Sequence, residues 1–167
     1  DMKNGKYFKD TRTMTVAFTE RNYDEDLVTF DLTVNGGETI TKKMSEWKNT
    51  KDSENAITVS ECKGESNVHT YTITFGADGK DIDYEIVPHI TDKADNVNTG
   101  ITYAEGTEAG QEFTVDMVAP VISVKYRTIN PAQDITEDIG EQKQDSMYKN
   151  ADVAADIFIN ERNFAAQ

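Results

Sequence analysis

Apolar and polar side chains alternate along much of this chain, and this period of two restricts the fold more than any other feature. The clearest example is residues 28–34, which read VTFDLTV. Successive side chains of a β-strand point to opposite faces, so the pattern predicts a strand with one buried face. Similar segments, each predicted to form a strand, lie at residues 13–19, 57–59, 68–75, 82–90, 113–115 and 121–126.

Helical periodicity is hard to find in the sequence. Met44 and Trp47 are three residues apart and predict one helical turn at most, within residues 41–48. Gly, Asn and Asp residues separate the strand segments, for example in residues 76–79, GADG. Many short strands joined by such turns predict an all-β fold, an antiparallel β-sandwich.

A segment near the N-terminus recurs near the C-terminus. Residues 7–23 read YFKDTRTMTVAFTERNY, and residues 148–164 read YKNADVAADIFINERNF. Glu20 recurs as Glu161, an offset of 141 residues (161 − 20), and the apolar positions of the two copies keep the same phase. An ungapped match of this kind predicts slightly more than one repeat of about 140 residues. It also predicts a strand, and no helix, at the alanine-rich residues 151–156.

The chain is strongly acidic, with 31 Asp and Glu against 17 Lys and Arg and a formal net charge of −14. Nucleic-acid binding needs a basic footprint, and so does attraction to an anionic membrane surface. No apolar stretch approaches the roughly 18 residues of a membrane span. We therefore expect no nucleic acid and no membrane insertion. The acidity predicts a solvated, self-repelling surface, with divalent cations as the alternative partner.

Cysteine and histidine are scarce. Cys62 is the only cysteine, which excludes a disulfide within the chain and a cysteine-based metal site. His69 and His89 are the only histidines, which excludes a histidine-rich zinc site. A Ser–His–Asp triad would need one of these two. Both lie in strand-like runs, where a histidine more often faces solvent or is satisfied structurally.

Three segments resemble the bacterial immunoglobulin-like repeats that occur in tandem in surface proteins of Gram-positive bacteria. Residues 7–23 are similar to the family's opening YYN-DRTVTVTVTERNF. Residues 77–96 contain ADG, Tyr84 and TDKADN, which is similar to ADGDYT…TDKAGN, with Asp95 where the family usually has Gly. Residues 112–124, EFTVDMVAPVISV, are similar to FTVDKTAPVISV at the junction between repeats. Together these segments cover about a third of the chain, and their order and spacing carry the resemblance.

The resemblance implies an immunoglobulin-like antiparallel β-sandwich with Trp47 and Tyr84 in its core. It also implies an extracellular location, at the cell surface or in the cell wall, in arrays whose modules act as spacers or adhesive units. It implies no catalytic residue and no cofactor. Residues 50–65 depart from the family pattern and are interpreted as an insertion.

The family's repeat begins with the strand APVISV, which here lies at residues 119–124. Residues 1–118 are therefore predicted to form an immunoglobulin-like sandwich that lacks its first strand. Residues 119–167 are predicted to form the first two strands of the next repeat, with an acidic insertion at 128–147. A missing strand leaves a sheet edge open. We expect neighbouring repeats of the same chain as partners, and residues 119–167 to fill that edge on the first module or by strand exchange with another chain.

One candidate metal site stands out, a calcium loop formed by Asp92, Asp95 and Asn96, whose oxygens are hard ligands. The favoured interpretation is an Asx turn in which Asp92 and Asn96 bond the loop backbone, because no EF-hand spacing follows.

The Glu-Arg-Asn sequence follows a strand in both copies of the repeat. It predicts a turn in which Arg21 pairs with a carboxylate and Asn22 is left-handed. Two acidic pairs invite comparison with glycosidase carboxylates, namely Asp24 with Asp26 and Asp81 with Asp83. Alternating Asp residues usually lie on the solvent face of a sandwich, so a structural interpretation is favoured. An internal Lys–Asn isopeptide bond is a further hypothesis, for which no motif singles out a pair.

The sequence thus predicts a non-catalytic structural module, a spacer that holds a distal domain away from the cell. The alternative is an adhesin-type module that binds a host surface protein or a glycan through long loops, at residues 50–66 and 128–147. Both segments are poor in aromatic residues, which favours the spacer. An enzyme, which needs convergent polar groups in a pocket, is the least favoured class.

Overall fold

Strands make up about half of the residues that the structure describes and helices only a small part, which confirms the all-β prediction. The computed structural model describes residues 2–3, 7–60, 63–98, 101, 111–136 and 152–164. The chain divides into two compact units, Asp1–Val118 and Ala119–Gln167. They are called unit 1 and unit 2, and each is described by itself.

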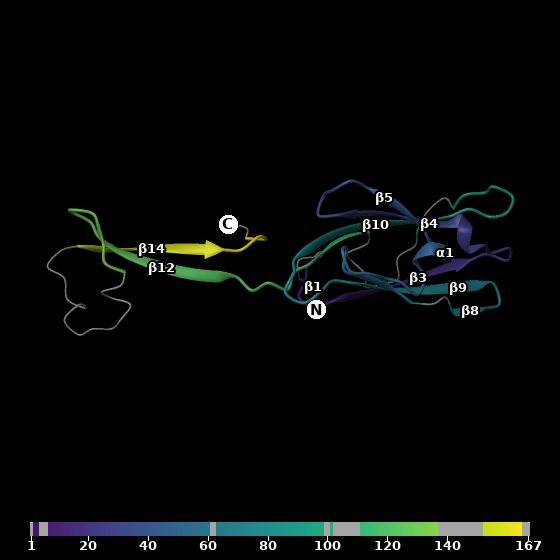
Figure 1. Cartoon of the computed structure of the whole chain (residues 1–167), viewed down its shortest axis with the longest axis horizontal. Coiled ribbons are helices and arrows are strands. Elements are labelled where there is room, and N and C mark those ends of the chain that lie inside the picture. The colour runs from purple at the N-terminus through teal and green to yellow at the C-terminus, as the bar shows by residue number, and fades with distance from the viewer. Residues whose placement is uncertain are drawn as a thin grey trace. The chain divides into compact units, whose positions relative to one another are not determined.

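Unit 1 contains two packed sheets (Figure 1). The first has the strand order β1-β2-β11-β10-β4-β5, and these strands span Met2–Lys3, Tyr7–Phe8, Glu112–Val115, Ile82–Ile90, Val28–Val34 and Ile40–Lys43. The second has the order β3-β9-β7-β6, with β8 also paired to β9, and these strands span Arg12–Thr19, Val68–Phe75, Ile57–Val59, Lys51–Asp52 and Lys63–Glu65. Among the described strands of unit 1, only β2 and β11 pair in parallel.

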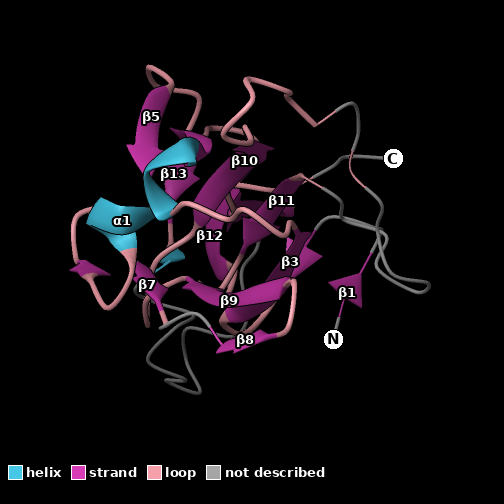
Figure 2. Ribbon diagram, turned by 90° about the vertical axis from the view of Figure 1, so that its right-hand side faces the viewer, coloured by secondary structure: helices cyan, strands magenta, loops and turns pink. Residues whose placement is uncertain are grey.

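The core lies between these two sheets, whose strands are drawn in Figure 2, and its buried residues include many aromatic rings. Phe75 of β9 lies edge-on to Tyr84 of β10 and to Phe113 of β11, with ring centroids 5.1 and 5.0 Å apart. Phe18 of β3 makes a similar contact with Phe30 of β4 at 6.3 Å. Each edge-to-face pair adds roughly 0.5–1.5 kcal/mol beyond the burial of its area. The inward residues of the alternating strands therefore meet in one core, as a sandwich requires.

Two short helical segments connect strands of unit 1: η1, Glu25–Leu27, and α1, Met44–Trp47. In α1, Met44 and Trp47 point into the core, which confirms the predicted single turn. Trp47 packs on Phe30 with ring centroids 5.4 Å apart. Trp47 is 3% exposed and Tyr84 is 1% exposed, so both occupy the core as expected.

Residues 50–65, which were interpreted as an insertion, contain the predicted strand at residues 57–59, and this strand is confirmed as β7. The segment supplies β6 and β7, which extend the second sheet beyond β9. Ile57 and Val59 of β7 are each only 1% exposed and belong to the core. A turn at residues 53–56 separates the two short strands, and β6 contains no apolar residue by which the sequence could reveal it.

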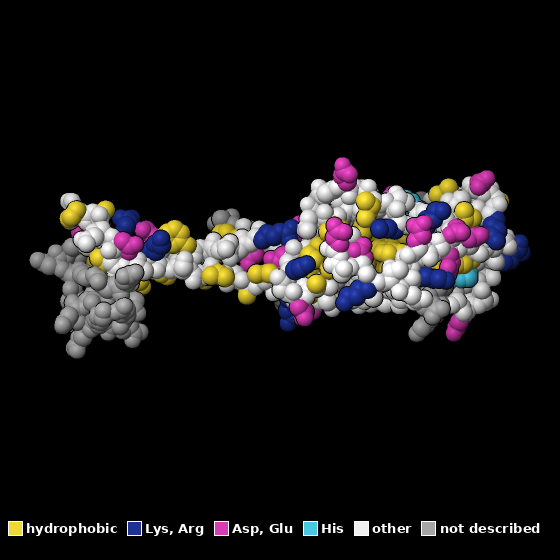
Figure 3. Space-filling model, in the orientation of Figure 1, with side chains coloured by type: hydrophobic (Ala, Val, Ile, Leu, Met, Phe, Trp, Pro, Cys, Tyr) yellow, Lys and Arg dark blue, Asp and Glu magenta, His cyan; other side chains and the backbone are white. Residues whose placement is uncertain are grey.

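Unit 2 is an antiparallel sheet in the order β13-β12-β14, whose strands span Gln133–Asp134, Val121–Thr128 and Val153–Asn160. β12 and β14 pair along their whole length. One face of this pair is apolar and largely uncovered (Figure 3), with Ile122, Val124, Ile157 and Ile159 between 36% and 66% exposed. Most of the predicted acidic insertion, from residue 137 to 147, lies outside the described residues.

Residues 119–167 were expected to fill an open sheet edge. β12 and β14 pair with each other in a sheet of their own, in which two consecutive antiparallel strands satisfy each other's backbone groups directly. Filling of the edge, on the first module or by strand exchange with another chain, stays a prediction.

The two copies of the repeated segment have the same secondary structure where both are described, at residues 11–23 and 152–164. β14 begins 141 residues after β3 (153 − 12), and both strands are eight residues long. Met14, Val16 and Phe18 of β3 pack against the core of unit 1. The residues 141 positions later lie on the apolar face of unit 2. The predicted repeat is therefore matched in strand position and in the phase of its apolar side chains.

Candidate functional site

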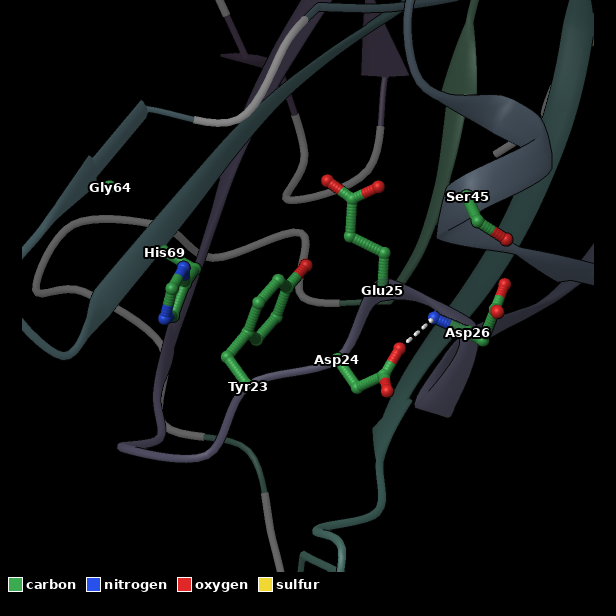
Figure 4. Close-up of a pocket in the computed structure, with 7 residues that line it drawn as sticks. All are labelled: Tyr23, Asp24, Glu25, Asp26, Ser45, Gly64 and His69. Carbon is green, nitrogen blue, oxygen red and sulfur yellow. Dashed lines mark hydrogen bonds between the residues drawn. The ribbon is translucent and has the colours of Figure 1, made fainter.

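An open depression of about 550 Å³ lies beside the turn that follows β3 (Figure 4). Its walls come from that turn, η1, α1, β8 and β9. The lining residues are Tyr23, Asp24, Glu25, Asp26, Ser45, Gly64 and His69. Three of these seven residues carry carboxylates, so the depression is acidic.

Tyr23 and His69 form the aromatic side of this depression. Their rings stack, with centroids 3.7 Å apart and planes 13° from parallel. The Tyr23 hydroxyl is hydrogen-bonded to the Tyr71 hydroxyl, and His69 Nε2 lies 3.3 Å from the Glu20 carbonyl oxygen, to which a protonated Nε2 donates. Burial raises the pKa of Tyr71 to about 12, so the neutral hydroxyl persists at physiological pH.

Two of the three carboxylates of the depression, those of Asp24 and Glu25, have structural partners. Asp24 Oδ1 accepts a hydrogen bond from the Asp26 N–H at 3.1 Å and caps η1. Glu25 forms an ion pair with Lys48 at 2.7 Å, and Lys93 Nζ lies 3.6 Å from Asp24. Of the Asp24 and Asp26 pair that was compared with glycosidase carboxylates, Asp24 therefore serves as a helix cap.

A serine–histidine pair is not assembled in this depression. Ser45 of α1 and His69 of β9 lie on opposite sides of it in Figure 4. The arrangement can accept hydrogen bonds or attract a cation through its carboxylates. Among its lining residues it does not bring a nucleophile to a base.

The candidate calcium loop is closed by its own hydrogen bonds. Asp92 Oδ1 accepts from the N–H groups of Ala94 and Asn96 at 2.8 and 2.9 Å, and Asp92 Oδ2 accepts from the Asn96 side-chain amide at 2.8 Å. Asp95 adopts the left-handed conformation, with φ of 64°. The Asn96 side chain first, and then the two backbone N–H groups, hold the pKa of Asp92 below its usual range. This geometry is that of the predicted Asx turn, in which the oxygens of Asp92 already have donors.

The repeated Glu-Arg-Asn turn is closed by its glutamate in both copies. Glu20 Oε1 accepts from the Asn22 N–H at 2.8 Å, and Glu161 Oε1 accepts from the Asn163 N–H at 2.9 Å. Asn22 has no positive φ, so the left-handed prediction is wrong. The glutamate already closes the turn without a left-handed residue. Arg21 forms no ion pair with a described carboxylate, contrary to the prediction.

Asp81 and Asp83 each connect β10 to the chain beside it. Asp81 Oδ1 accepts from the N–H groups of Met117 and Val118 at 2.9 and 2.8 Å. Asp83 Oδ1 accepts from the Thr114 hydroxyl at 2.8 Å. These bonds hold the segment around β11 against β10, which is the structural role favoured from the sequence.

His89 has a carboxylate partner on the solvent face of the first sheet. Its Nε2 lies 3.0 Å from Asp31 Oδ2, and both side chains are more than a third exposed. This pair is two-thirds of a hydrolytic triad, yet within the described residues no serine hydroxyl is bonded to His89.

Two features of unit 1 had no signal in the sequence. The Tyr23–His69 stack joins residues 46 positions apart (69 − 23), and neither residue shows a spacing that points to the other. The Arg12 guanidinium lies over the rings of Phe8 and Phe113, 4.3 and 4.6 Å from their centroids. The stack arises because β3 pairs with β9, and the Arg12 contact arises because β3 of the second sheet packs against β2 and β11 of the first.

No family model, no curated protein and no solved structure matches this chain. Within the described ranges, no helix is long and apolar enough to cross a membrane.

Proposed function

We propose that the chain is a non-catalytic spacer module of a multi-repeat bacterial cell-surface protein, with an immunoglobulin-like sandwich as its repeating unit. The observation that carries the proposal is the repeat itself. β3 and β14 coincide at an offset of 141 residues (153 − 12). The glutamate that closes the following turn does so in both copies. A unit that recurs with the same strand and the same turn is what an array of stacked modules requires.

The use of the polar side chains supports the same proposal. Asp24, Asp81, Asp83 and Asp92 each accept hydrogen bonds that cap, close or connect elements of unit 1. Side chains in such positions serve the folding of every module. The acidic surface keeps neighbouring arrays apart and in solution.

The alternative is an adhesin-type module that binds a host surface protein or a glycan. The depression lined by Tyr23 and three carboxylates favours this alternative, since a sugar can be held by an aromatic ring and by carboxylates that accept from its hydroxyls. One face of the Tyr23 ring is already covered by His69, which leaves less of it for a ligand.

A concatemer tests the spacer function. Residue 160 is equivalent to residue 19, so residues 119–160 followed by residues 20–118 form one complete repeat. Chains of two, three and four such repeats are made, and their maximum dimension is measured by small-angle X-ray scattering. A spacer predicts the same increase in length for each added repeat. Collapse of the longer chains to a compact particle would contradict the spacer function.

The adhesin alternative has a separate readout. Glycans and host matrix proteins are arrayed and probed with the labelled chain. Saturable binding that is lost in the Tyr23→Ala variant and kept in the exposed control Thr19→Ala would favour the adhesin function over the spacer function.

A further inference from the structure

β3 is an edge strand with one free side. It is the last described strand of the second sheet and pairs only with β9. Its inward residues Met14 and Val16 are only partly buried, whereas Ile73 and Phe75 of β9 are fully buried. A strand beyond β3 would cover these two side chains.

The backbone groups that point to the free side can be identified. The Glu20 N–H donates to the Asn67 carbonyl at 2.9 Å, in register with the β3–β9 pair. In an antiparallel ladder the residues that bond a given neighbour alternate. Residues 12, 14, 16 and 18 therefore bond β9, and Thr13, Thr15, Ala17 and Thr19 direct their N–H and C=O groups to the free side.

β14 is the second copy of β3, and its neighbour in the sheet is β12. The Ile129 N–H donates to the Asp152 carbonyl at 2.9 Å, in register with that ladder. By the same alternation, residues 154, 156, 158 and 160 of β14 bond β12. Subtracting the repeat offset of 141 gives residues 13, 15, 17 and 19, the ones whose backbone groups are free in β3. The residues of β14 that bond β12 therefore correspond one by one to the residues of β3 whose backbone groups face the free side.

We propose that the free edge of β3 binds the β12 segment of a second copy of this chain in exchange for that copy's own β14, antiparallel, with Val121 opposite Thr19 and Ser123 opposite Ala17. This register is the one β12 has with β14, moved by the repeat offset. Ile122, Val124 and Tyr126 then face inward, next to Phe18, Val16 and Met14. The inference goes beyond the spacer function and does not depend on it, since any role is compatible with strand addition.

The charge of the β12 segment also favours its binding at the β3 edge. The segment from residue 119 to 130 reads APVISVKYRTIN and carries Lys125 and Arg127, while the whole chain has a net charge of −14. In the proposed register both basic residues lie on the outer face, opposite Thr15 and Thr13. Neither charge is buried by the addition.

A synthetic peptide of residues 119–130 tests the proposal on the full chain, by fluorescence anisotropy. We expect saturable binding of the labelled peptide. N-methylation of Ser123 and Lys125 removes N–H groups that face β3 and should weaken binding at least about tenfold. N-methylation of Val124 and Tyr126, whose N–H groups face away, is the matched control and should leave binding unchanged.

Side-chain variants give a second arm. Val124→Asp in the peptide places a charge against the core and should weaken binding at least about tenfold, whereas Ser123→Asp on the outer face should not. In the chain, Ala17→Pro removes an N–H group that faces the free side, a position where an edge strand tolerates proline. Ala17→Pro should abolish binding, and Ala17→Val should retain it. The N-methylated peptides decide the question if Ala17→Pro does not fold.

Cysteine crosslinking fixes the place and the register. In a Cys62→Ser background, Ala17→Cys should form a disulfide with a peptide carrying Ser123→Cys, since directly opposed Cβ atoms lie about 4.5–5.5 Å apart. A peptide with Lys125→Cys, two residues out of register, should react far less. Absence of saturable binding, binding that ignores the N-methyl groups, or equal crosslinking of the two peptides would each overturn the proposal. The last two outcomes would indicate adsorption to an apolar surface or pairing with unit 2.

Discussion

At the scale of single residues, the acidic residues that were candidates for a metal or catalytic site form hydrogen bonds that hold the backbone in place. Asp92 closes a loop, Glu20 closes a turn, and Asp81 bonds the two N–H groups that follow β11. A carboxylate that accepts two or three N–H bonds has little left to offer a metal or a substrate. Acidic residues beside turns are therefore weak evidence of a site until their acceptor atoms are accounted for.

Asp92 gives a prediction that depends on pH. Its hydrogen bonds to Asn96 and Ala94 hold its pKa below the usual range in the folded state. A lowered folded pKa contributes stability above the unfolded pKa, and the contribution is lost as pH falls through the folded pKa. Asp92→Asn should therefore lower the urea midpoint at neutral pH, by an amount that shrinks below about pH 4.

The control for this variant is Asp95→Asn, because the exposed Asp95 side chain accepts no hydrogen bond within the described loop. It should leave the urea midpoint unchanged at both pH values. A deficit of Asp92→Asn that stays constant from neutral pH to about pH 3 would contradict the assigned role.

The sequence predicted residue roles only where the partners are close along the chain. The Asx turn at Asp92 was predictable because all its donors lie within four residues. The Tyr23–His69 stack was not, since the pairing of β3 with β9 brings the two rings together. The left-handed conformation predicted for Asn22 was wrong for a local reason, because the Glu20 side chain closes the turn by accepting from the Asn22 N–H.

At the scale of elements, the β9–β10 turn shows how a glycine fixes the junction of two strands. Gly76 has a φ of 106°, and its N–H donates to the Ala56 carbonyl at 2.9 Å. A Cβ at this position would lie 2.8 Å from Val115 Cγ1. The turn therefore needs glycine both for its backbone conformation and for the packing of β11.

Gly76→Ala should lower the free energy of unfolding by about 2–4 kcal/mol, from the strained φ and from overpacking together. The matched control is Gly79→Ala, whose φ of 72° is also unfavourable but whose Cβ would meet nothing within 4 Å. The control should cost only about 1 kcal/mol. Both are measured by urea unfolding at neutral pH, and equal losses would contradict the packing role of Gly76.

Long alternating strands were predictable, and of the two short strands beyond β9 only β7 was predicted. β4, β9 and β10 show the period of two over seven to nine residues. β6 and β7 are two and three residues long, so their sequence shows little more than Ile57 and Val59. Their place in the sheet is decided by β9, which no local pattern reveals.

At the scale of the whole molecule, the repeat explains both the open edge of unit 1 and the uncovered face of unit 2. β3 lacks the neighbour that β14 has, and β14 lacks the facing sheet that β3 has. Unit 2 therefore shows the neighbouring strand that is missing beside β3, and unit 1 shows the facing sheet that is missing opposite β14. The repeat could be predicted from the sequence, whereas the partner strand of each copy required the hydrogen-bond register.

Hydrogen exchange of the full chain, followed by NMR, tests the open edge of β3 most directly. The account predicts alternation, with the amides of Thr13, Thr15 and Ala17 exchanging at least about tenfold faster than those of Met14 and Val16. β4 is the internal control, because it lies between β10 and β5 and should be protected at successive residues. Equal protection of successive amides along β3 would show that the edge is already occupied, and would contradict the account.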